Sequence, residues 1–267
     1  MPNINNDEID YKIYGEELQF VEIELDPGET AVAESGAFMM MDSDIQMHTI
    51  FGDGSQQQGN GLMGKLFSAG KRLLVGESLF MTAFTNNGQG KKKVSFAAPY
   101  TGKIIVFDLK ALGGKIIAQK DAFLCAAKGV SIGIEFQKRL GTGIFGGEGF
   151  IMEKLEGDGL AFAHAGGYVI EKELKAGEIL KVDTGCIVAY TPGVDFDIEF
   201  ISGIKNWMFG GEGLFFAVLT GPGKVWIQSL PISRLAGRII RYAPQTGGRK
   251  EEGSILGGLG NLLDGRE

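Results

Sequence analysis

The chain has 267 residues, of which 44% are hydrophobic and 22% are charged, so it can bury a sizeable core and is not an unfolded polymer. Its formal net charge of −7 disfavours broad binding to nucleic acid, because the phosphate backbone would repel it. The 43 glycines and only 7 prolines, without a collagen period, indicate many tight turns between short strands.

The polar, acidic start MPNINNDEID is not a signal peptide, and no run of residues reaches the roughly 18 apolar positions that a membrane-spanning helix needs. Cys125 and Cys186 lie in apolar surroundings and show neither a paired framework nor a metal-ligand spacing. We therefore expect a cytoplasmic protein whose thiols stay reduced.

In chain order, a polar lead-in at 1–17 is followed by three units with similar openings, FVEIELDPGE, IIVFDLKALGGK and VIEKELKAGE. We place these units at 18–100, 101–166 and 167–231, within a single all-β domain. The first unit is longer because GDGSQQQGNGLMGKLFSAGKRLLV is inserted after its IQMHTI strand. Each unit consists of short runs rich in Val, Ile, Phe and Met between Gly, Asp, Asn or Pro, which is typical of strands and turns.

A shift of the chain by 64 residues supports this division. It brings FGGEG at 145–149 onto FGGEG at 209–213 and IEF at 134–136 onto IEF at 198–200, and VGESLFMTAF is a weaker third copy. Because a repeat of this length exceeds a solenoid turn or a propeller blade, each unit should be a small sheet assembly. We expect the three units to surround a pseudo-threefold axis.

Helical periodicity is confined to two stretches, LMGKLFSAGKRLL in the insertion and PISRLAGRII after the third unit. Either could form a short helix. The region 232–267 should therefore hold a short helix and a Gly-rich, loosely ordered tail.

The familiar catalytic and nucleotide-binding motifs in this sequence lack the neighbouring elements or side chains that their function requires. The G-x-G-x-x-G at 141–146 precedes a strand instead of a helix, and the near P-loop at 59–66 has Leu66 where Mg²⁺ needs a hydroxyl. His48 and His164 have no metal-ligand spacing and fit ordinary half-buried imidazoles. We expect no cofactor.

Three glutamates recur at the start of corresponding strands, Glu77, Glu148 and Glu212. If they faced a common axis, their like charges would require a cation or raised pKa values. The structural alternative is favoured, in which glycine supplies a positive φ and the carboxylate accepts backbone N–H groups in the turn.

The loops that precede these glutamates combine apolar or aromatic side chains with positive charge. Their members are Phe67, Lys71, Arg72, Arg139, Phe145, Lys205, Trp207 and Phe209. Such loops could meet a membrane surface or a protein partner, or they could close the open end of the fold against water. Both interpretations stay open.

The L-x-x-G-E turns, the insertion ending in KRLLVGESLF and the two GGEG islands resemble the bacterial and archaeal relatives of the mitochondrial biogenesis protein named for altered inheritance of mitochondria. The resemblance covers residues 15 to 245. It implies an all-β fold grouped with the tryptophan-RNA-binding attenuation protein (TRAP), of the double-stranded β-helix type, and it supplies no catalytic residues. Mitochondrial members are associated with inner-membrane organisation.

From these observations we expect a non-enzymatic interaction or scaffold protein that meets a protein or a membrane surface through the apolar-basic loops. A second hypothesis is a module that binds a small ligand or single-stranded RNA, suggested by the fold relative. An enzyme using the repeated glutamates is the least favoured. The pattern leaves the oligomeric state open.

Overall fold

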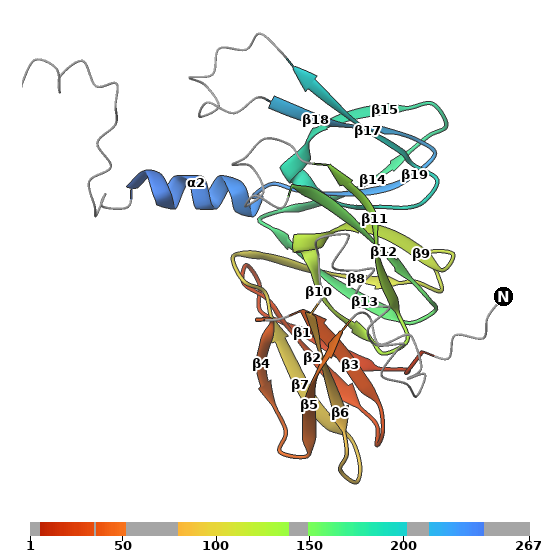
Figure 1. Cartoon of the computed structure of the whole chain (residues 1–267), viewed down its shortest axis with the longest axis vertical. Helices are drawn as coiled ribbons and strands as arrows, with labels where there is room; N and C mark the ends of the chain where they lie inside the picture. The colour runs from red at the N-terminus through yellow and green to blue at the C-terminus, as the bar shows by residue number, and fades with distance from the viewer. Residues whose placement is uncertain (1–5, 35, 52–79, 139–148, 202–213, 243–267) are drawn as a thin grey trace, which may run out of the picture. The chain divides into compact units, whose positions relative to one another are not determined.

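The computed structural model describes residues 6–34, 36–51, 80–138, 149–201 and 214–242. The chain divides into two compact units, Met1–Arg234 and Leu235–Glu267. In the described part of the first unit, antiparallel strands and short turns account for most residues (Figure 1). The prediction of a mostly β protein is therefore confirmed.

Four antiparallel sheets are formed by the described strands. The first has the spatial order β1 (Asp10–Tyr14), β2 (Phe20–Leu25), β7 (Lys92–Ala97) and β4 (Phe38–Met41). The second has the order β5 (Ile45–Phe51), β6 (Phe80–Asn86), β3 (Thr30–Glu34), β10 (Phe123–Ala127), β13 (Leu160–Gly166) and β8 (Gly102–Asp108).

The third and fourth sheets continue along the chain. The third has the order β11 (Ser131–Lys138), β12 (Phe150–Glu156), β9 (Lys115–Gln119), β16 (Ile187–Tyr190), β19 (Gly223–Gln228) and β14 (Val169–Leu174). The fourth has the order β15 (Ile179–Asp183), β18 (Leu214–Thr220) and β17 (Asp195–Ile201).

The strands pair in the same order in three successive stretches of chain. In the first stretch β2 pairs with β7, β3 with β6, β5 with β6, and β4 with β7. The second stretch repeats these pairings as β8–β13, β9–β12, β11–β12 and β10–β13, and the third as β14–β19, β15–β18, β17–β18 and β16–β19. A register shift interrupts β4, β10 and β16 at the same point, after Phe38, Phe123 and Ile187.

Two further pairings join neighbouring stretches, β3 with β10 and β9 with β16. Among the described residues, β4 pairs only with β7 and β15 only with β18, so the strand pairing makes an open series. The pseudo-threefold axis, the unit boundaries and the likeness to TRAP stay predictions.

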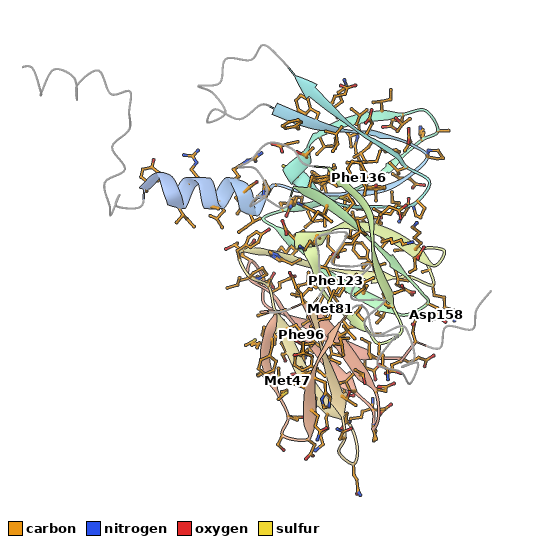
Figure 2. The ribbon with its side chains drawn as sticks, viewed as in Figure 1. Met47, Met81, Phe96, Phe123, Phe136 and Asp158 are labelled. Carbon is orange, nitrogen blue, oxygen red and sulfur yellow. The ribbon has the colours of Figure 1, made fainter. Side chains whose placement is uncertain are left out.

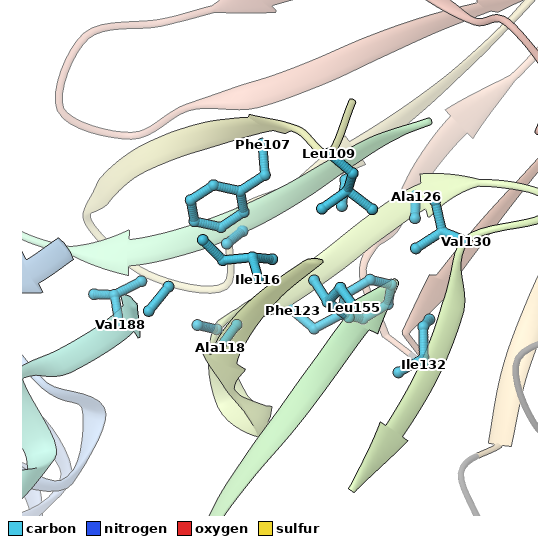
Figure 3. Close-up of a cluster of buried hydrophobic side chains, with 14 of the residues drawn as sticks. Phe107, Leu109, Ile116, Ala118, Phe123, Ala126, Val130, Ile132, Leu155 and Val188 are labelled. Atoms are coloured by element: carbon cyan, nitrogen blue, oxygen red, sulfur yellow. The ribbon is translucent and has the colours of Figure 1, made fainter. Parts of the chain in front are cut away.

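Each pair of successive sheets encloses one cluster of buried apolar side chains. The first cluster includes Val21, Ile23, Phe84 and Phe96, the second Phe107, Leu109, Ile116, Phe123 and Leu155 (Figure 3), and the third Phe150, Met152, Leu174 and Leu219. Strand β2 alternates because one face meets a cluster. The second and third sheets have clusters on both faces, so β10 and β16 are buried at every position and read as FLCAA and IVAY.

Short helices are few in the described residues. The two 3₁₀ turns η1 (Lys120–Ala122) and η2 (Thr184–Cys186) connect β9 to β10 and β15 to β16. Helix α2 (Ile232–Tyr242) confirms the helix predicted in PISRLAGRII. The other expected helix, at 62–74, and the predicted loose tail lie outside the described residues.

Candidate interaction edge

The side chains that the sequence singled out all lie outside the described residues. These are Glu77, Glu148 and Glu212 and the loop residues Phe67, Lys71, Arg72, Arg139, Phe145, Lys205, Trp207 and Phe209. One described neighbour is Gly149, which directly precedes β12 and has a φ of +91°. A cation site and an apolar-basic loop surface therefore stay predictions, and the candidate site described here comes from other residues.

The most exposed apolar segment of a described strand is β4, whose sequence is FMMM. The exposed fractions of its four residues are 40% for Phe38, 48% for Met39, 45% for Met40 and 37% for Met41. Only β7 pairs with β4 among the described strands, so β4 is one of the two outer strands of the first sheet. An edge strand normally carries charges or proline, or is covered, because its free backbone groups otherwise attract another strand.

The exposed side chains lie beside the first core cluster. The ring of Phe38 stacks on the buried ring of Phe84, with 5.5 Å between centroids. Met47 on β5 is 45% exposed and lies directly opposite Phe84 in the pairing of β5 with β6. Phe84 and Phe96 both belong to the first cluster, and Figure 2 labels Met47 and Phe96. We call Phe38, Met39, Met40, Met41 and Met47 together the β4 edge patch.

Charged side chains around this patch are already paired. Lys92 lies 2.6 Å from the carboxylate of Asp44, and its hydrogen bond to Asp44 raises the pKa of Lys92. Lys93 lies 2.7 Å from Glu22, and its backbone N–H donates to the carboxylate of Asp42 at 2.8 Å. An apolar centre with paired charges at its border is the composition of a protein-binding surface.

Sequence reasoning did not find this patch. FMMM between Gly36 and Asp42 reads like any buried strand, and its counterparts β10 and β16 are indeed buried at every residue. Those two strands have a described partner on both sides, whereas β4 has one. The exposure of β4 is thus a consequence of its place at the end of the sheet.

The two histidines do not form a site. His164 on β13 is 2% exposed, and the ring of Tyr100 meets it edge-on with 4.4 Å between centroids. By strict hydrogen-bond geometry neither ring nitrogen has a partner among the described residues. Burial lowers the pKa of His164 to about 4, and the nearby backbone of Tyr100 opposes this lowering. His48 is exposed. The expectation that both are half-buried is therefore wrong.

Other titratable groups also have shifted pKa values. Glu34 at the end of β3 is exposed as a residue, but desolvation of its carboxyl group by neighbouring atoms raises its pKa to about 7; the charge of Asp121 adds to this rise and that of Lys120 opposes it. Cys125 and Cys186 are free and buried, and burial raises the pKa of both thiols. Within the described ranges, no three His, Cys, Asp or Glu side chains gather as metal ligands, and no helix is long and apolar enough to cross a membrane.

The geometry defines a class of antiparallel multi-sheet β protein with an exposed apolar strand edge. Its affiliation is more specific: residues 11–230 match the model of the mitochondrial biogenesis AIM24 family, and the chain belongs to this family. The chain is 30% identical over 232 residues to an uncharacterised protein of Streptococcus pyogenes serotype M6, covering 85% of this chain and 88% of that protein.

A solved structure supports the same architecture. The crystal structure of a protein from Streptococcus pyogenes matches this chain with a TM-score of 0.68 and 24% identity, covering 88% of this chain and all of that one (100%). At this level of identity the likeness concerns the fold alone. It agrees with a mostly β chain of several antiparallel sheets.

Proposed function

We propose that this chain is a non-enzymatic cytoplasmic interaction protein, which holds a protein partner through the β4 edge patch. The single observation that carries the proposal is the run of four exposed apolar residues on a strand with one described neighbour. An extended segment of a partner that pairs with β4 would satisfy its outward backbone groups and cover its side chains. The two buried free thiols support a reducing compartment.

The side chains of the patch suit a protein contact. Methionine side chains are unbranched and polarizable, and they adapt to the surface that packs against them. Burial of a methionine or phenylalanine side chain contributes about 1.5–3 kcal/mol relative to leaving it in water. The backbone hydrogen bonds of an added strand would set its direction and register.

The test compares capture of proteins from the source cells by the parent chain and two variants. Met40→Lys places a charge in the patch, and Ile170→Lys is its matched control, because Ile170 is 49% exposed on the edge strand β14. We expect proteins that bind the parent and the control but not Met40→Lys. A purified captured protein should also slow hydrogen exchange of the β4 amides. The same captured set on all three chains would refute the proposal.

A further inference from the structure

We propose that the partner of β4 is β15 of a second copy of this chain, so that copies join head to tail through one continuous sheet. This inference rests on the proposed function, because it names the occupant of the β4 edge patch. It is carried by the two strand pairings that connect successive stretches of this chain, β3 with β10 and β9 with β16. We call these two pairings joints.

Those two joints have the same geometry. In the first, β3 pairs antiparallel with β10, with Ala33 opposite Cys125; in the second, β9 pairs antiparallel with β16, with Ala118 opposite Ala189. Ala33 and Ala118 are each the second-last residue of their strand. Cys125 and Ala189 are each the first paired residue after the register shift of β10 and β16.

Strands β4 and β15 occupy the corresponding positions at the two ends of the series. β4 pairs with β7 as β10 pairs with β13, and it has the same register shift, between Phe38 and Met40. β15 pairs with β18 as β9 pairs with β12, and a 3₁₀ turn directly follows both β9 and β15. Among the described strands, β4 thus has the form of a joint strand without the neighbour that precedes it in a joint. In the same set of strands, β15 has the form of one without the neighbour that follows it.

The exposure of β4 and β15 agrees with this comparison. Both strands of each described joint are largely buried, whereas all four residues of β4 are exposed and Ile179 at the start of β15 is 61% exposed. Nevertheless β4 carries four apolar residues and no charge, which is the composition of the buried strands β10 and β16. The sequence of β4 suits a covered strand, and a second copy supplies a cover of the required shape.

The joint geometry also predicts the register. The second-last residue of β15 is Val182, which should face Met40 of the second copy, the first residue after the shift. The next pair of this antiparallel ladder places Lys181 opposite Met41. Each copy offers one β4 and one β15, so the contact is heterologous and repeats from copy to copy, into a closed ring or an open row.

The first experiment exchanges charge at the predicted pair. The parent should sediment at multiples of 28.6 kDa. Met41→Lys places a second ammonium group opposite Lys181, which already pairs with Glu199 of its own copy at 2.5 Å, and should raise the concentration of half-assembly about tenfold or more. Adding Lys181→Glu to the same chain should restore assembly, because the pair then attracts. Ile170→Lys is the control and should assemble like the parent, and equal melting temperatures would show that the variants fold.

The second experiment tests direction and register with cysteines. A chain with Met41→Cys and a chain with Lys181→Cys should form a disulfide with each other on oxidation, since directly opposite residues have the spacing that a disulfide requires. The native cysteines are buried and give a low background. Neither chain should cross-link with itself. Self-cross-linking of Met41→Cys would show β4 against β4 and would overturn the inference.

The outcomes separate this inference from the proposed function. A parent chain that stays at 28.6 kDa, while the β4 edge patch still captures other proteins, would overturn self-pairing and leave the proposed function intact. Failure of Lys181→Glu to rescue Met41→Lys would refute the β15 register. Assembly that Met41→Lys does not weaken would exclude β4 from the contact.

Discussion

Protonation of His164 should destabilise the fold at mildly acidic pH. The imidazole is 2% exposed, and by strict geometry its nitrogens have no described hydrogen-bond partner. The Tyr100 ring lies edge-on to it, with 4.4 Å between the ring centroids. A Cβ added at Gly102 would lie 2.6 Å from its Nε2 atom, so the backbone of β8 also approaches the ring closely. A charged imidazolium at this place would lose its hydration without gaining a counter-ion.

The magnitude follows from the pKa. Burial lowers the pKa of His164 from 6.5 to about 4, so the unfolded chain binds more protons than the folded chain between these two values. The stability contributed by the neutral imidazole is therefore complete above pH 6.5 and is lost as the pH falls towards 4. Linkage converts this lowering into about 3 kcal/mol of unfolding free energy.

Glu34 acts in the opposite direction over an overlapping range. Its pKa is raised from 4.5 to about 7, mainly by desolvation, so its contribution to stability is complete below pH 4.5 and is lost as the pH rises through 7. Because Glu34 is exposed, solvent screening makes this contribution smaller than that of His164. The pH profile of the parent alone therefore mixes two opposite effects. Only the difference between the parent and a His164 variant isolates the imidazole.

The assay is urea unfolding of the parent, His164→Gln and His48→Gln between pH 4 and 8. Glutamine is a suitable replacement because a buried glutamine already occurs on β19, which corresponds to β13 in the next stretch of chain. That residue, Gln228, makes two hydrogen bonds: it accepts from the Gly166 N–H and donates to the Gly185 carbonyl. The difference in unfolding free energy between the parent and His164→Gln should change by about 3 kcal/mol over this range. His48→Gln should follow the parent, because His48 is exposed. A difference that does not vary with pH would refute this reasoning.

Three further predictions concern folding and the segments outside the described residues. Asn86→Ala should lower the unfolding free energy by about 2–4 kcal/mol in chemical denaturation, because the buried amide bonds three backbone groups at 2.8–2.9 Å, whereas the exposed Asn87→Ala should change it little. If the apolar-basic loops meet membranes, the parent should co-sediment with anionic liposomes and the Phe145→Ala, Trp207→Ala double variant should not; equal sedimentation would contradict this. Glu148→Gln should lower the melting temperature if its role is structural, whereas an unchanged temperature with loss of a measurable activity would favour an enzyme.

Much of the fold could be read from local patterns. Short runs rich in Val, Ile, Phe and Met predict strands, and FVEIEL at the opening of the first unit forms β2, which buries Val21, Ile23 and Leu25. Periodicity in PISRLAGRII predicts a helix, and α2 forms over most of that stretch. These predictions succeed because strand and helix periods are properties of a short segment and its side chains.

The candidate site could not be predicted from local sequence patterns in the same way. The glutamates and loops that the sequence singled out lie outside the described residues, and the β4 edge patch consists of residues that read as ordinary core. The exposure of Met40 depends on whether a strand lies beside β4, and a strand's own residues do not state which neighbour it has. His164 similarly looked like a half-buried imidazole until its surroundings on β13 were known.

The sequence by itself determined the mostly β class of fold and the family, because composition, period and glycine spacing act over short distances. Only the tertiary structure decided which strands become neighbours. Long-range pairing joins β3 to β10 and β9 to β16, buries those strands on both sides, and leaves β4 and β15 each with one described partner. An identical kind of apolar strand is therefore core in the middle of the series and an exposed edge at its end.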